Sequence, residues 1–97
     1  MKWRVYIRPM ARADLQKAHD WYEEQCAGLG EEFLLAAAEV LLRLESNPER
    51  YPFYYGKFRR ALTRRFPYKL FFQIHGNAVI IFRVFHGAQE HKRRLRD

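Results

Sequence analysis

Lys69 and His86 are the two side chains of one predicted β-hairpin that could act on a phosphate group and its protons. Gly76-Asn77 fits the two-residue loop of this hairpin, and such a loop predicts that Lys69 lies opposite Val84. Because side chains alternate between the two faces of a strand, Lys69 and His86 then share one face. An ammonium can stabilise an anion, and an imidazole, which titrates near neutrality, can transfer a proton.

Two phenyl rings, Phe71 and Phe82, belong to the same predicted face. A face that combines rings with an ammonium and an imidazole suits a polyanion or the amphipathic helix of a partner, so we expect function there. The opposite face of the hairpin is nearly all apolar and is predicted to be core. Arg83 falls on this core face, where we expect an ion pair with Glu39 or Glu45 of a helix rather than catalysis.

Basic residues are concentrated in the second half of the chain. Residues 1 to 50 hold seven Lys or Arg and nine Asp or Glu, whereas residues 51 to 97 hold eleven and two, so the halves carry −2 and +9. Such a field favours an anionic partner, either a nucleic acid or an acidic protein. The residues expected to contact the target or the partner are Arg59, Arg64, Arg65, Phe71, Phe82, Lys92, Arg93 and Arg94.

The spacing of apolar residues predicts a single α+β domain over residues 1–97. Alternation from Trp3 to Ile7 is typical of a strand, and helical spacing over residues 11–27 and 29–46 predicts two antiparallel helices. Three β-rich runs after residue 57 predict a three-stranded antiparallel sheet that covers this helical hairpin. The tail, residues 87–97, has one apolar residue, Leu95, so we expect it to be mobile and to contact the target.

The cysteine count and the hydropathy exclude several classes of protein. Cys26 is the only cysteine, so neither an internal disulfide nor a zinc site built from thiolates is expected. We expect no metal ion and no cofactor. No apolar run approaches the roughly 20 residues of a membrane span, and residues 1–8 do not resemble a signal peptide. The expected location is the cytoplasm.

Three short motifs occur in order along this pattern: NPxxYP at residues 47–52, FPYKLFFxI at residues 66–74 and RVFHG at residues 83–87. With the order β, α, α, β, β, β, they resemble the RelE/ParE superfamily of type II toxin-antitoxin toxins. The resemblance covers essentially the whole chain. It implies an antiparallel sheet backed by a helical hairpin, and a toxin held inactive by a cognate acidic antitoxin. A homodimer and a toxin-antitoxin hetero-oligomer both stay open.

One branch of this superfamily cleaves mRNA on the ribosome. The 2′-hydroxyl attacks the adjacent phosphate, cations stabilise the resulting anion and one side chain transfers protons. By the resemblance, the basic positions fall on Lys69, Arg60 and Leu62, and the acid or base falls near His86. Leu62 removes one cation, and no tyrosine follows His86. The strand register that decides whether Arg60 joins the other two is not given by the sequence.

The other branch, which is ParE-like, is associated with inhibition of DNA gyrase. The ending RVFHGAQEHKRRLR looks more like this branch, and Leu62 also fits it. We therefore predict a ParE-like gyrase inhibitor, with a ribosome-dependent mRNA interferase as the alternative; only the alternative is an enzyme. A third hypothesis is a nucleic-acid-binding module that stacks bases on Phe71 and Phe82.

Overall fold

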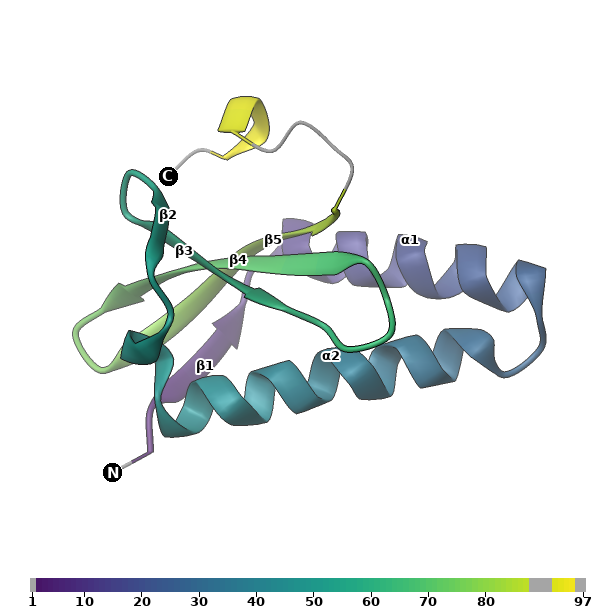
Figure 1. The fold of residues 1–97 in the computed structure, drawn as a ribbon, viewed down its shortest axis with the longest axis horizontal. Coiled ribbons are helices and arrows are strands. Elements are labelled where there is room, and N and C mark those ends of the chain that lie inside the picture. The colour runs from purple at the N-terminus through teal and green to yellow at the C-terminus, as the bar shows by residue number, and fades with distance from the viewer. Residues whose placement is uncertain (1, 88–91, 96–97) are drawn as a thin grey trace.

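Two helices pack on one side of a five-stranded sheet in the computed structural model, which describes residues 2–87 and 92–95 (Figure 1). The elements, in chain order, are β1 (Arg4–Ile7), α1 (Pro9–Gln25), α2 (Leu29–Ser46), the 3-10 turn η1 (Pro48–Arg50), β2 (Phe53–Tyr55), β3 (Phe58–Leu62), β4 (Tyr68–His75), β5 (Ala78–His86) and the 3-10 turn η2 (Lys92–Arg94).

The sheet is larger than the predicted one and is mixed rather than antiparallel. Its strand order is β1-β5-β4-β3-β2, and β1 runs parallel to β5. A parallel neighbour needs a long connection, and here the chain between β1 and β5 includes both helices and strands β2 to β4. The fifth strand, β2, forms within residues 49–57, the connector between the second helix and the first of the three β-rich runs. The three-stranded prediction is therefore wrong in extent, although β3, β4 and β5 are antiparallel as predicted.

A side chain of α1 caps the start of α2. The Glu23 carboxylate accepts hydrogen bonds from the Gly28 N–H at 2.8 Å and the Gly30 N–H at 3.0 Å. These are N–H groups that a helix N-terminus leaves without a partner inside the helix. Gly30 also lets the helices approach closely, because a Cβ there would lie 2.6 Å from the His19 carbonyl oxygen. The turn between the helices is therefore fixed by side-chain contacts as well as by its backbone.

The main core lies between the helices and the near face of the sheet, which we call the first face. Val40 and Leu44 of α2 and Ala11 of α1 pack against Leu70 and Phe72 of β4. All five are fully buried. Since this face provides most of the aliphatic burial, it supplies much of the hydrophobic stabilisation of the fold.

A β-bulge interrupts the predicted hairpin. Pairing follows the Gly76-Asn77 loop as far as Phe72 and Ile81, but the next pair is Phe71 with Arg83, so Phe82 is an extra residue on β5. A residue inserted in one strand shifts every later side chain to the other face relative to an uninterrupted ladder. The faces predicted for Arg83, Val84, Phe85 and His86 are therefore wrong.

Beyond the end of β1, Arg8 and α1 provide hydrogen bonds to the edge of β5. The Arg8 N–H donates to the Ile81 carbonyl at 3.0 Å, and beyond that point the Asp14 carboxylate accepts from the Val84 N–H at 2.9 Å. The same carboxylate binds the Arg83 guanidinium through two hydrogen bonds of 2.8 and 3.0 Å. The predicted ion pair between Arg83 and a helix carboxylate is confirmed, but its partner is Asp14 and not Glu39 or Glu45.

The C-terminal turn η2 packs on the far face of the sheet. Leu95, which is only 5% exposed, joins a cluster with Phe58, Phe71, Phe82 and Phe85. The burial of Leu95 argues against a mobile tail for residues 92–95, because these aromatic rings provide the apolar site that Leu95 needs. Residues 88–91 and 96–97 lie outside the described part of the chain. Within that part, neither helix is apolar enough over its length to cross a membrane.

Candidate functional site

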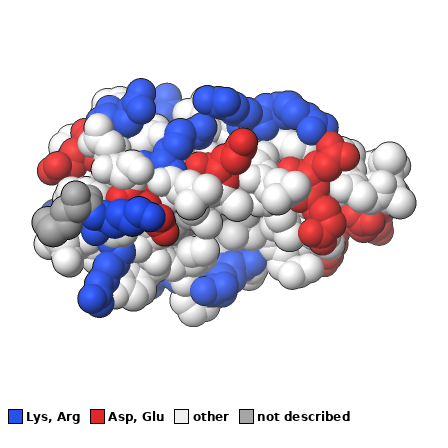
Figure 2. Space-filling view, turned by 90° about the horizontal axis from the view of Figure 1, so that it is seen from below, with Lys and Arg blue, Asp and Glu red and all other residues white. Residues whose placement is uncertain are grey.

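The face of the sheet opposite the helices combines aromatic rings with cations; we call it the second face. Its side chains come from alternate positions of the strands and include Phe58, Arg60, Lys69, Phe71, Phe82 and Phe85. None of the five strands, all of which are described, contains Asp or Glu. Figure 2, seen from the side of α2, shows the largest group of acidic residues at the end that holds the turn between the two helices, with further acidic residues near the middle and at the opposite end.

The aromatic rings of the second face form a buried layer. The Phe71 ring lies 5.5 Å from that of Tyr54 and 5.7 Å from that of Phe85, measured between centroids. Phe71 is completely buried, and Phe82 is only 8% exposed. Both were predicted as exposed contact residues, and that prediction is wrong because Leu95 and neighbouring rings cover them. The rings are therefore not open to stacking by a base.

Guanidinium groups lie over this layer on its outer side. Three such pairs join Arg8 to Phe82 at 4.4 Å, Arg60 to Tyr54 at 4.2 Å and Arg94 to Phe85 at 4.2 Å, each measured from guanidinium carbon to ring centroid. Attraction between a cation and the face of a ring holds the long side chain near one position. The second face therefore presents positioned cations above an apolar layer.

The pairing of β3 with β4, which the sequence left open, makes Arg60 and Lys69 close neighbours on this face. Arg60 pairs with Phe71, and Leu62 pairs with Lys69, so the two cations lie on a diagonal of adjacent strands. Leu62, at the position of the absent second cation, is 54% exposed. The backbone register thus brings together two of the three residues suggested for catalysis.

His86 is the third, and it lies on the other side of the sheet. It pairs with Tyr68, and the two rings meet edge to face with centroids 5.4 Å apart. The prediction that Lys69 and His86 share a face is wrong, because the extra residue Phe82 reverses the alternation between the loop and His86. Burial raises the pKa of the Tyr68 hydroxyl, which keeps that neighbour neutral.

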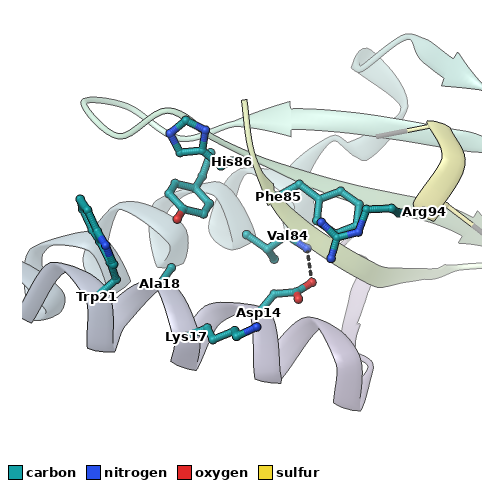
Figure 3. A pocket seen from close by; sticks show the side chains of 9 residues that line it. Asp14, Lys17, Ala18, Trp21, Val84, Phe85, His86 and Arg94 are labelled. Atoms are coloured by element: carbon teal, nitrogen blue, oxygen red, sulfur yellow. Dashed lines mark hydrogen bonds between the residues drawn. The ribbon is translucent and has the colours of Figure 1, made fainter. Parts of the chain in front are cut away.

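A pocket of about 270 Å³ lies beside His86, between α1 and the end of β5 (Figure 3). Trp21 lies at one end of the view and Arg94 at the other, with Lys17 and Asp14 of α1 between them. The Trp21 side chain is well exposed, whereas the Asp14 carboxylate is occupied by Arg83 and the Val84 N–H. Lys17 and Arg94 line this pocket together with His86, whereas Arg60 and Lys69 do not.

The remaining predicted residues divide between structural contacts and open surface. Arg59 donates to the carbonyls of Glu49 at 3.1 Å and Tyr51 at 2.6 Å, so it fastens the connector to β3. Arg65 has φ +72° and pairs with Glu32 at 2.8 Å, which ties the loop after β3 to α2.

Arg64 and Arg93, like Arg65 and Arg94, are exposed. Arg64 lines a groove of about 410 Å³ between its loop and α2, on the helical side of the molecule. Lys92 begins η2, and its side chain is outside the described atoms.

Sequence analysis missed Arg8 and Tyr54 as members of the second face. The alternation that places Val5 and Ile7 on the first face also places Tyr6 on the second, and its continuation would have placed Arg8 there. No comparable signal exists for Tyr54, which lies in the short strand β2. Within residues 2–87 and 92–95, no three His, Cys, Asp or Glu side chains are placed to hold a metal ion.

The sequence and the fold are similar to those of known toxins. The profile of a toxin family, described as the ParE toxin of the type II toxin-antitoxin system parDE, matches residues 5–91. No protein with a curated description matches the chain in sequence.

Three solved structures share the fold. The chromosomal ParDE toxin-antitoxin system from P. aeruginosa is similar with a TM-score of 0.74 at 20% identity, covering 88% of this chain and 96% of that one. The toxin-antitoxin complex RelBE2 from Mycobacterium tuberculosis gives 0.66 at 25% identity, covering 89% and 99%. The archaeal RelE-RelB complex from Pyrococcus horikoshii gives 0.53 at 18% identity, covering 93% and 100%.

Proposed function

The chain belongs to the ParE toxin family of type II toxin-antitoxin systems, and from this premise we propose that it inhibits DNA gyrase and is neutralised by a cognate acidic antitoxin. The predicted membership of the RelE/ParE superfamily is confirmed by the family match, and the shared fold agrees with it. The proposal concerns the target, because gyrase inhibition and RNA cleavage both occur on this fold.

The single observation that carries the choice of target is that His86 lies on the opposite face of the sheet from Arg60 and Lys69. RNA cleavage needs a proton-transferring group within hydrogen-bond reach of the same phosphate that the cations hold, about 2.6 to 3.2 Å between heavy atoms. Arg60 and Lys69 lie on the second face, whereas His86 lies with Tyr68 on the first. A single bound phosphate cannot meet all three without a change in strand pairing.

The exposed side chain of Leu62 supports the same choice. It is the neighbour of Lys69 across the strands, at the position where the mRNA interferases carry a second cation. Losing one charge-stabilising group typically costs about 2.7 to 4 kcal/mol of transition-state stabilisation. Rapid RNA cleavage is therefore disfavoured on two independent grounds.

Cleavage of mRNA is the second candidate, and one observation favours it. Arg60 and Lys69 are diagonal neighbours, and Arg94 lies over the ring of Phe85, which pairs with Lys69. Three cations close together could hold one phosphate of an RNA strand. The likeness to RelBE2, at 25% identity, is consistent with this alternative.

The antitoxin part of the proposal rests on charge and on the relatives. The second half of the chain carries +9, and all three structural relatives are described as toxin-antitoxin pairs. An acidic partner encoded beside this gene would reduce that charge on binding and would meet the toxin rapidly.

The experiment compares both targets in one induced culture. Supercoiling of a reporter plasmid and codon-positioned cleavage of mRNA are followed over the same time course, for the native protein and for Lys69→Ala and His86→Ala. We expect supercoiling to fail before translation declines, and purified protein to inhibit gyrase without cutting RNA. Prompt mRNA cleavage that disappears in both variants would instead establish the interferase.

A further inference from the structure

We propose that the second face binds the phosphate backbone of duplex DNA directly, through Arg8, Arg60, Arg94 and Lys69. This goes beyond inhibition of gyrase, because it assigns the toxin its own contact with nucleic acid. The four side chains come from the end of β1, from β3, from β4 and from η2. They meet only in the folded chain.

The arginines are held in place before any ligand arrives. Their guanidinium carbons lie 4.2 to 4.4 Å from ring centroids, so each group rests on a ring. A guanidinium resting on a ring can still donate to phosphate oxygens, and its restricted motion lowers the entropy lost on binding. Lys69 pairs with Phe85 across β4 and β5, and its ammonium adds a point charge to this face.

The spacing of these cations suits a polyanion rather than a single anion. The Arg60 guanidinium lies over Tyr54 of β2 and the Arg94 guanidinium lies over Phe85 of β5, three strand positions or about 14 Å away. Duplex DNA carries one phosphate charge per roughly 1.7 Å of its axis. Cations this far apart therefore meet different phosphates of one duplex.

The covered rings favour a duplex over a single strand. Proteins that bind single strands stack bases on open aromatic faces. Here Phe71 and Phe85 are no more than 2% exposed, and a guanidinium occupies one face of the Phe85 ring. The outward surface carries the four cations beside the exposed Tyr6 and Leu62, and backbone phosphates are what a duplex presents to such cations.

An acidic protein fits this face less well than DNA does. A protein interface takes much of its affinity from anchor side chains buried in apolar pockets. Leu95 already fills the apolar site of the second face and is 5% exposed. Protein–DNA interfaces, in contrast, are polar and strongly basic.

The test measures how binding depends on salt, with toxin freed from its antitoxin and a short duplex of mixed sequence as the probe. The logarithm of affinity falls with the logarithm of salt concentration at about −0.9 per phosphate neutralised. Four cations predict a slope of about −3.6, or roughly a hundredfold loss between about 50 and 200 mM salt. Anisotropy of a labelled duplex reports the slope.

A matched pair of double variants separates this face from general basicity. Arg60→Gln with Arg94→Gln, and Arg12→Gln with Arg50→Gln, each lower the net charge from +7 to +5. Arg12 is exposed on α1 and Arg50 is exposed in η1, and neither is one of the four side chains of the proposed site. We expect the first pair to reduce the slope by about 2, leaving roughly a tenfold loss over that range, and the second to keep the native slope.

Each other outcome would overturn the proposal. Equal slopes for the two double variants would mean that binding follows net charge alone. Tighter binding to a single strand of the same length would assign recognition to bases. No binding to the duplex at low salt would remove the site. Arg60→Lys checks the fold: it keeps the charge, so it should retain the native slope. The measurement contains no gyrase, so its result stands apart from that of the gyrase assay.

Discussion

The two faces of one sheet are buried in different ways. The first face is covered by two helices of 17 and 18 residues and packs mainly aliphatic side chains against them. The second is covered by its own rings, by three arginines and by the short segment that ends in Leu95. The comparison indicates that stability is concentrated on the first face, whereas the second combines modest burial with a dense and accessible positive charge.

Truncation of the Phe72 side chain on the first face should give the largest effect. Phe72 is fully buried between the sheet and the helices, and replacing a buried Phe by Ala typically costs about 3 to 5 kcal/mol. Urea unfolding of Phe72→Ala measures the loss. If that variant does not fold, Ile81→Val, with an expected loss of about 1 kcal/mol, tests the same packing. A smaller loss for Phe72→Ala than for Leu95→Ala would contradict the comparison.

The next largest loss of stability is expected for Asp14→Ala, because Asp14 joins α1 to the edge of β5. The change leaves the Arg83 guanidinium unpaired, although the side chain is only 15% exposed, and it frees the Val84 N–H. Removing one partner of a buried pair costs about 3 kcal/mol at the low end. Asp14→Asn, which can still accept from the Val84 N–H, should lose less. Equal losses for the two variants would show that the charge, and not the edge hydrogen bond, matters.

Leu95→Ala should cost about 2 kcal/mol, the lower end for a buried leucine, since a segment near the end of the chain can relax around the cavity. Removal of the chain after Gly87 should cost at least as much, in contrast to the small change expected of a mobile tail. Thermal and urea unfolding of both variants measure this. Native stability in the truncated protein would show that the second face does not depend on its cover.

The smallest effect should come from pH acting on the helical hairpin alone. A hydrogen bond with Asp20 raises the pKa of His19, so its stabilisation is present below the ordinary value of 6.5 and is lost as pH rises through the folded value. Hydrogen bonds from the Gly28 and Gly30 N–H groups lower the pKa of Glu23, so its stabilisation is lost as pH falls below 4.5. The melting temperature should fall slightly from about pH 5.5 to 8, and His19→Gln should abolish that fall.

Local patterns were sufficient to predict most of the elements. Alternation and helical spacing predicted the first strand and both helices, and the Gly76-Asn77 loop gave the correct pairing from His75 to Phe72. These signals are local, since they depend on a period of two or 3.6 residues and on one turn. The family resemblance rested on the order of such elements, which is why a chain with short and degenerate motifs could still be assigned.

The candidate site depended on features that a single sequence does not show. One extra residue at Phe82 moved His86 away from Lys69, and nothing in the residue types distinguishes a bulged strand from a regular one. The position of Leu95 depends on a pocket formed by rings from β3, β4 and β5. Local sequence thus determined the elements and the charge, whereas tertiary packing decided which side chains share a face, because register and docking are set by contacts between distant segments.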